Sequence, residues 1–303
     1  MTVEPLVAVQ IAVAALQNLL FAMAAGSLAC ALMGKRSGIA ASAALRSGQA
    51  GLAIVLTLTA LAYLWLQAAV MSGSPLAGAG PAVTAVLTQS HYGVAWSVGF
   101  IGAVLAVLSR LSDRRGLPLF AAGLIAWVAG KAAASHAADA GDFSARELIH
   151  VVHLCATALW AGSVIVAGLL ARRLWRVASA TAVQRAAFCA ALSHLATAAL
   201  VIVLVTGFYN VVQDTAHADA PLVHTPWGHI LAAKLACVAL AIALGGWNRM
   251  AVLPVLRTRA EENDPAYGAA QQRFDTLLAI EAVAMVAVLV LAAVLGHTAP
   301  GGG

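Results

Sequence analysis

Residues 275–297 read DTLLAIEAVAMVAVLVLAAVLGH, an apolar run interrupted by a single central acid, Glu281. A helix of about 20 apolar residues crosses the roughly 30 Å hydrocarbon core of a bilayer, so this run predicts a membrane-spanning helix. Seven other stretches have the same character, and their unbroken runs favour helices over the alternating pattern of an outer-membrane barrel. The eight predicted spans cover about residues 6–33, 51–71, 82–109, 117–137, 148–171, 186–212, 228–248 and 275–297.

The composition of the whole chain agrees with this prediction. Of the 303 residues, 62% are hydrophobic and 10% are charged, and the mean hydropathy is +0.91, whereas soluble domains carry about 25% charged residues. Too few charges remain to cover a soluble surface, so most of the chain is expected to face lipid. We therefore predict an all-α, polytopic membrane protein with eight transmembrane helices that forms a single membrane domain over residues 1–303.

The basic residues lie in alternate connections between the predicted spans. One set of connections holds 14 of the 17 lysines and arginines. Because cytoplasmic loops carry the excess of Lys and Arg, these connections are expected to face the cytoplasm and both termini the periplasm. The net charge of +5 is then a sign of topology, and no nucleic-acid partner is expected. Only Glu4 is charged ahead of the first span, which is expected to be a membrane helix and not a signal peptide.

The histidines are sorted by this topology. Eight of the nine fall in predicted outer loops or at the outer ends of spans, and only His194 lies toward the inner side. Imidazole is the commonest metal-ligating side chain, and ionisable residues retained in a membrane are usually functional. The alternative for each histidine is anchoring in the headgroup region. The candidate ligands are His91, His136, His150, His153, His217, His224, His229 and His297.

The sharpest local pattern is HVVH at 150–153. Histidines at i and i+3 share one face of a helix, as two ligands of one ion must, and Trp160 continues that face into the bundle. His136 closes the fourth predicted span, and a loop of about ten residues returns the chain to His150, so these histidines are expected to lie close together. Met71 ends the second span, and a thioether beside imidazoles suits copper.

Lys131, Lys234 and Glu281 are charged residues that lie inside predicted spans. Counting 1.5 Å per residue, Lys234 lies roughly 10 Å from the outer surface and Glu281 roughly 10 Å from the inner one. Lysine can extend its side chain outward to the interface. Glu281 has less reach and is the better candidate for carrying a proton or acting as a counter-ion.

Several short motifs follow in order: SHA at 135–137, HVVH at 150–153, LWAG at 159–162, TGFYN at 206–210, WGHIL at 227–231 with Lys234, WNR at 247–249, and Glu281. This series, over about residues 131–297, resembles the CopD/PcoD family of bacterial inner-membrane copper proteins. The first four spans agree with that family in number and hydropathy only. The resemblance implies an eight-helix inner-membrane protein that handles copper, usually beside a periplasmic copper carrier.

The leading hypothesis is a copper permease, with Cu(I) or Cu(II) as its cargo and no enzymatic activity. His136, His150 and His153 would capture copper at the periplasmic face, with His91 and Met71 completing or feeding the site. His217 and His224 would form a receiving surface, and His229 and His297 are further candidate ligands. The residues expected to line the path or couple protons are Glu281, Lys234, Trp160 and Asn210. The sequence has no P-loop, so transport would be passive or ion-coupled.

Two alternatives stay open. One is a membrane redox protein that holds b-type haem between outer-end histidines on facing helices, because haem iron takes axial histidine. The other is a copper-delivery or assembly factor that does not transport the ion. An optical spectrum separates the first from a permease, whereas the sequence does not separate the second.

Overall fold

The computed structural model describes residues 3–39, 43–111, 116–135, 141–177, 180–216 and 224–299. Over these ranges the secondary structure is helical, without a strand. Eight of the helices in these ranges are long and apolar enough to cross a membrane. The predicted class, an all-α multi-pass membrane protein with eight spans, is therefore confirmed.

The long helices are α1 (Val3–Arg36), α2 (Ala43–Ser72), α4 (His91–Leu111), α5 (Gly116–Ala133), α6 (Ala145–Val177), α7 (Ala182–Thr215), α8 (Pro226–Trp247) and α10 (Tyr267–Leu295). The shorter elements are the 3-10 turn η1 (Leu76–Gly78), α3 (Gly80–Gln89), the π-helical turn η4 (Asn248–Val252) and α9 (Leu253–Glu261). The η4 turn and α9 prolong α8, so the seventh span extends beyond its predicted end at residue 248.

The third predicted span, residues 82–109, is wrong at its start. It is divided between α3 and α4 at Ser90, whose backbone is extended (φ −124°, ψ 148°). The Ser90 hydroxyl oxygen accepts a hydrogen bond from the Gly93 N–H at 3.1 Å, as a residue preceding a helix commonly does. The membrane-spanning helix therefore begins at His91.

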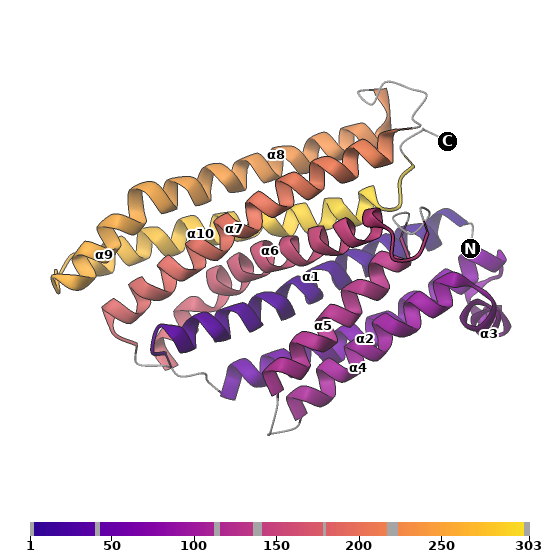
Figure 1. Cartoon of the computed structure of the whole chain (residues 1–303), viewed down its shortest axis with the longest axis horizontal. Coiled ribbons are helices and arrows are strands. Elements are labelled where there is room, and N and C mark those ends of the chain that lie inside the picture. Colours follow the sequence, from indigo (N-terminus) through magenta and orange to yellow (C-terminus); the bar gives the residue numbers. More distant parts are fainter. Residues whose placement is uncertain are drawn as a thin grey trace.

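The long helices lie side by side, and α1 begins at the end of the bundle where α10 ends (Figure 1). Helix α6 packs against α1, α7 and α10, while α4 and α5 form a close pair at one side. The described histidines other than His194 lie near the end where α1 begins, which we call the histidine end.

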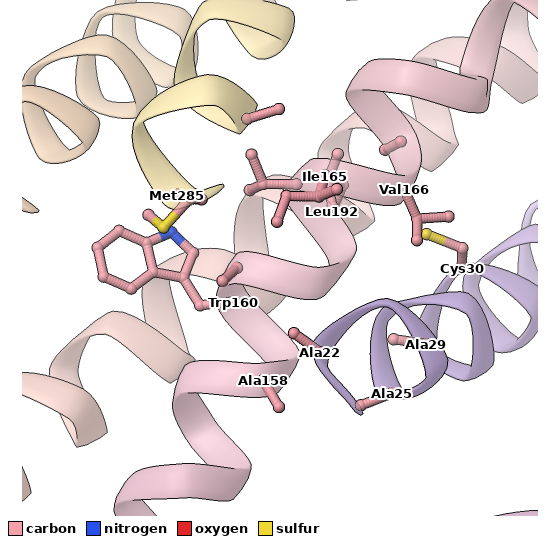
Figure 2. Close-up of a cluster of buried hydrophobic side chains, with 14 of the residues drawn as sticks. Ala22, Ala25, Ala29, Cys30, Ala158, Trp160, Ile165, Val166, Leu192 and Met285 are labelled. Atoms are coloured by element: carbon pink, nitrogen blue, oxygen red, sulfur yellow. The ribbon is translucent and has the colours of Figure 1, made fainter. Parts of the chain in front are cut away.

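Small residues bring α1 and α6 together. A Cβ atom on Gly26 would collide with the backbone of Gly162, and one on Gly162 would collide with the Ala22 carbonyl. Figure 2 shows Ala22 and Ala25 of α1 beside α6. On another side of α6, the Trp160 side chain lies next to Met285 of α10. Glycine and alanine allow membrane helices to approach this closely. The close packing against α1 helps to hold α6 in the centre of the bundle.

Candidate copper site

The two histidines of the HVVH motif lie near the beginning of α6. Ser144 begins this helix, since its hydroxyl oxygen accepts the Glu147 N–H at 3.2 Å while the Glu147 carboxylate accepts the Phe143 N–H at 2.7 Å. Ser144 is thus the N-cap of α6, and the Glu147 carboxylate satisfies the free backbone N–H of the preceding residue, Phe143. His150 and His153 follow with their ring centroids 6.5 Å apart and their planes inclined by 18°. The predicted shared face is therefore present, and both rings are half-buried.

Helix α7 supplies the neighbours of both imidazoles. The Nδ1 atom of His153 lies 2.9 Å from the Thr206 hydroxyl oxygen, and Nδ1 of His150 lies 3.3 Å from the Asn210 side-chain nitrogen. A Cβ on Gly207 would lie 3.1 Å from Cε1 of His153. Three residues of the TGFYN motif, on adjacent turns of α7, thus surround the pair.

Charged side chains surround the same end of α6. Arg146 donates to the Asp214 carboxylate at 2.9 Å, which joins the start of α6 to the end of α7. Lys234 of α8 is half-buried and lies within electrostatic range of both His150 and His153. Of the predicted path residues, Asn210 therefore contacts His150, while Lys234 acts on both imidazoles through its charge.

The α6 stripe continues inward to a buried acid. The Thr157 hydroxyl is buried and has no hydrogen-bond partner within the described ranges. Trp160 lies beside the carboxylate of Glu281 of α10, a residue that is 4% exposed. A Cβ on Gly245 of α8 would lie 3.0 Å from the Glu281 carboxylate. Thr157 and Trp160 thus lie on α6 between the histidine pair and the Glu281 carboxylate, which approaches α8 at Gly245.

The other predicted ligands lie in different surroundings. His91 is exposed and pairs with Asp142 at 2.7 Å. Met71 is 53% exposed, and His224 and His229 are exposed near the start of α8. His136 and His217 lie outside the described residues. In the part of the chain that the structure describes, no group of three or more His, Cys, Asp or Glu residues lies close enough to hold a metal ion.

His297 has both ring nitrogens occupied. Its Nδ1 donates to the Ala293 carbonyl at 2.8 Å, and its Nε2 lies 3.0 Å from the Tyr63 hydroxyl. Since a carbonyl can only accept, Nε2 of the neutral ring accepts the Tyr63 proton. These bonds join α10 to α2, and copper would have to displace Tyr63 to reach this ring.

Sequence reasoning placed Asn210 and Trp160 on the path but gave Thr206, Gly207 and Gly245 no role. Thr206 and Gly207 belong to the quoted TGFYN motif, and a polar residue four positions before Asn210 on the same helix was the available signal. Gly245 carried no comparable signal, because its role depends on the approach of Glu281 from another helix.

Two family models and a curated relative match this chain. The family model described as "Copper resistance protein D-like, N-terminal domain" matches residues 3–146, and the one described as "Copper resistance protein D" matches residues 186–295. Copper resistance protein D of Pseudomonas syringae pv. tomato is 26% identical over 261 residues, which cover 82% of each chain. No solved structure matches.

The fold and these matches define a multi-pass inner-membrane protein of copper handling. The chain belongs to the copper resistance protein D family. The resemblance seen in the sequence is thereby confirmed, and the N-terminal match extends it to the first four spans, where only number and hydropathy had agreed.

Proposed function

We propose that this protein transports copper across the inner membrane. The observation that carries the proposal is the pair of imidazoles on one face of α6, half-buried at one end of the bundle and supported by polar residues of α7. Imidazole is a good ligand for copper, and the family handles copper. His150 and His153 capture the ion, and the histidine end is the periplasmic end.

The remaining ligands come from the neighbouring connections. His136 precedes α6 in the chain, while His91 and Met71 lie at the same end of the bundle and complete or feed the site. His217 and His224 receive copper from a periplasmic carrier protein, and His229 is a further ligand on the way to the pair, whereas His297 could bind copper only by giving up its bond to Tyr63. Both oxidation states remain within the proposal, because imidazole accepts either and thioether favours Cu(I).

The ion then moves inward along the α6 stripe. Thr157 offers a buried hydroxyl without a partner in the described structure, and Trp160 leads to the Glu281 carboxylate. A carboxylate at this depth is costly in lipid and is typical of ion or proton pathways. Glu281 therefore compensates the charge of the passing ion or carries a coupled proton.

The geometry gives less support to a haem protein. Axial histidines would have to face each other from different helices. The described part of α7 instead presents Thr206 and Asn210 to the pair. A Soret band in the purified protein would contradict the transport proposal.

The deciding experiment measures copper uptake into vesicles containing the purified protein. Wild type should accumulate copper, and His153→Ala should not, while His194→Ala, which changes an exposed histidine far from the pair, should match wild type. Binding without uptake in the wild type would favour the copper-delivery alternative. Uptake by His153→Ala at the wild-type rate would overturn the proposed capture site.

A further inference from the structure

We propose that Thr206 is a positioning residue that fixes the protonation of His153, so that the Nε2 atom of this imidazole is the copper-binding atom. The inference rests on the proposed function, since it names the atom and the support of the same site. It follows from the direction of two consecutive hydrogen bonds.

The first bond determines where the Thr206 proton lies. The hydroxyl oxygen is 2.6 Å from the Ile202 carbonyl oxygen, one turn earlier on α7, and 3.4 Å from the Val203 carbonyl. A carbonyl has no proton to donate, so the hydroxyl donates to Ile202. Its single proton is then used, and toward any other neighbour the Thr206 oxygen can only accept.

The second bond transmits this direction to the ring. Nδ1 of His153 lies 2.9 Å from the same oxygen, so Nδ1 must carry the proton of the neutral imidazole. The other nitrogen, Nε2, keeps its lone pair. A histidine whose Nδ1–H is held by an oxygen acceptor while Nε2 faces the metal is the usual arrangement in metal sites, and here the acceptor is a hydroxyl whose own proton is held by the helix.

Gly207 leaves room for this orientation. A Cβ there would lie 3.1 Å from Cε1 and 3.6 Å from Nδ1 of His153, so any side chain would press on the ring edge that faces Thr206. The ring is therefore held by a hydrogen bond on one residue and by the absence of a side chain on the next.

His150 is held in a different way. Its Nδ1 faces the amide of Asn210, which can donate from its nitrogen or accept at its oxygen after a rotation of the amide. Asn210 therefore accommodates either form of His150. Of the two imidazoles, His153 therefore has a fixed tautomer, whereas His150 can adopt either tautomer.

The test is a copper titration of the detergent-solubilised full chain. Thr206→Val keeps the shape of the side chain but offers no acceptor, and copper affinity should fall about 10–100-fold, the range typical for residues that orient a ligand. Thr206→Ser retains the hydroxyl and should restore affinity to near the wild-type value. Thr197→Val is the matched control, because Thr197 makes the same bond to the residue four positions earlier on α7 (2.8 Å to the Ser193 carbonyl) at an exposed position; its affinity should be unchanged.

A second measurement needs no mutant of Thr206. Nitrogen NMR of the copper-free wild type, with the His153 signal identified by its loss in His153→Gln, should show a protonated Nδ1 and an unprotonated Nε2. The opposite form would overturn the inference, as would unchanged affinity in Thr206→Val. If the wild type does not bind copper while His153 shows the expected form, the proposed function fails but the role of Thr206 in fixing the ring stands.

Discussion

At the scale of single residues, the neighbours of each imidazole distinguish histidines that look alike in the sequence. His153 has a hydrogen bond at Nδ1 that leaves Nε2 available, whereas His297 uses both nitrogens to join two helices. His91 forms an exposed pair with Asp142. Among the described histidines, the α6 pair combines partial burial with a shared helix face, which is why we place copper capture there.

The first prediction concerns this pair. Replacing either His150 or His153 by Ala should lower copper affinity by more than about 100-fold, because a lost ligand costs more than the 10–100-fold of a lost supporting residue. The measurement is a copper titration of the single variants. His194→Ala is the control, since its Nδ1 faces only Arg249 at 3.4 Å on the other side of the molecule. Tight binding by both His150→Ala and His153→Ala, together with loss of binding in His224→Ala, would move the site to the outer loops.

The second prediction concerns the buried acid. Glu281→Gln keeps the size of the side chain and the acceptor for Trp160 but removes the charge. Copper uptake into vesicles should fall to a small fraction of the wild-type rate, while copper affinity in detergent stays nearly unchanged, because Glu281 lies inward of the histidine pair. Uptake at the wild-type rate would make Glu281 a structural partner of Trp160 and nothing more.

The sequence could predict the shared face of His150 and His153, because helical periodicity is local. It could not predict that Thr206 and Gly207, more than 50 positions further along the chain, would touch His153. That contact depends on which face of α7 turns toward α6, and nonlocal packing decides this. Ranking the eight outer histidines required the same information.

At the scale of helices, hydropathy located every span but misplaced several boundaries, among them the start of the third span. The apolar run at 82–109 continues through Ser90. Because hydropathy is averaged over many residues, it does not detect that the backbone of this one residue is extended and ends a helix. The Ser90 hydroxyl takes over the free Gly93 N–H at the start of α4, so the break has a local cause. Serine ahead of a helix was the available signal, and it was weaker than the apolar run around it.

The third prediction tests the contact between α1 and α6. Gly162→Ala places a methyl group against the Ala22 carbonyl, and overpacking of this kind typically costs about 1–3 kcal/mol of stability. Thermal unfolding in detergent should show a lower midpoint. The control is Gly51→Ala in α2, where a new Cβ meets no atom within 4 Å; removing a helical glycine there should be neutral or stabilising by about 0.5–1 kcal/mol. Equal midpoints for the two variants would contradict the close approach.

At the scale of the whole molecule, α6 connects the two halves of the chain. It packs against α1 from the first half and against α7 and α10 from the second. We therefore keep the proposal that residues 1–303 form one membrane domain. Charge and hydropathy predicted the number of spans, since each span is recognised from its own residues. Charge and hydropathy did not predict that α6 occupies the centre. The glycines and alanines that allow its close packing carry no charge and add little to the hydropathy.

The fourth prediction concerns orientation. Protease or tag accessibility in intact cells should place both termini and the 211–227 connection on the periplasmic side, because 14 of 17 basic residues lie in the opposite connections, as the positive-inside rule requires of the cytoplasmic face. The 172–185 connection should be protected and become accessible only after the membrane is permeabilised. Labelling of that connection in intact cells would reverse the topology and assign copper capture to the cytoplasm.

The crossing of Gly26 and Gly162 also has a consequence for how this family diverges. Because each position lies against the backbone of the other helix, a mutation that enlarges one of them leaves no space unless the opposite helix changes too. Related sequences should therefore show correlated substitutions between these two positions. Gly26 lies in the part matched by the N-terminal family model, and Gly162 lies between the two matched regions. Chimeras that take α1 and α6 from different relatives should assemble poorly, so that these two helices are inherited as a pair.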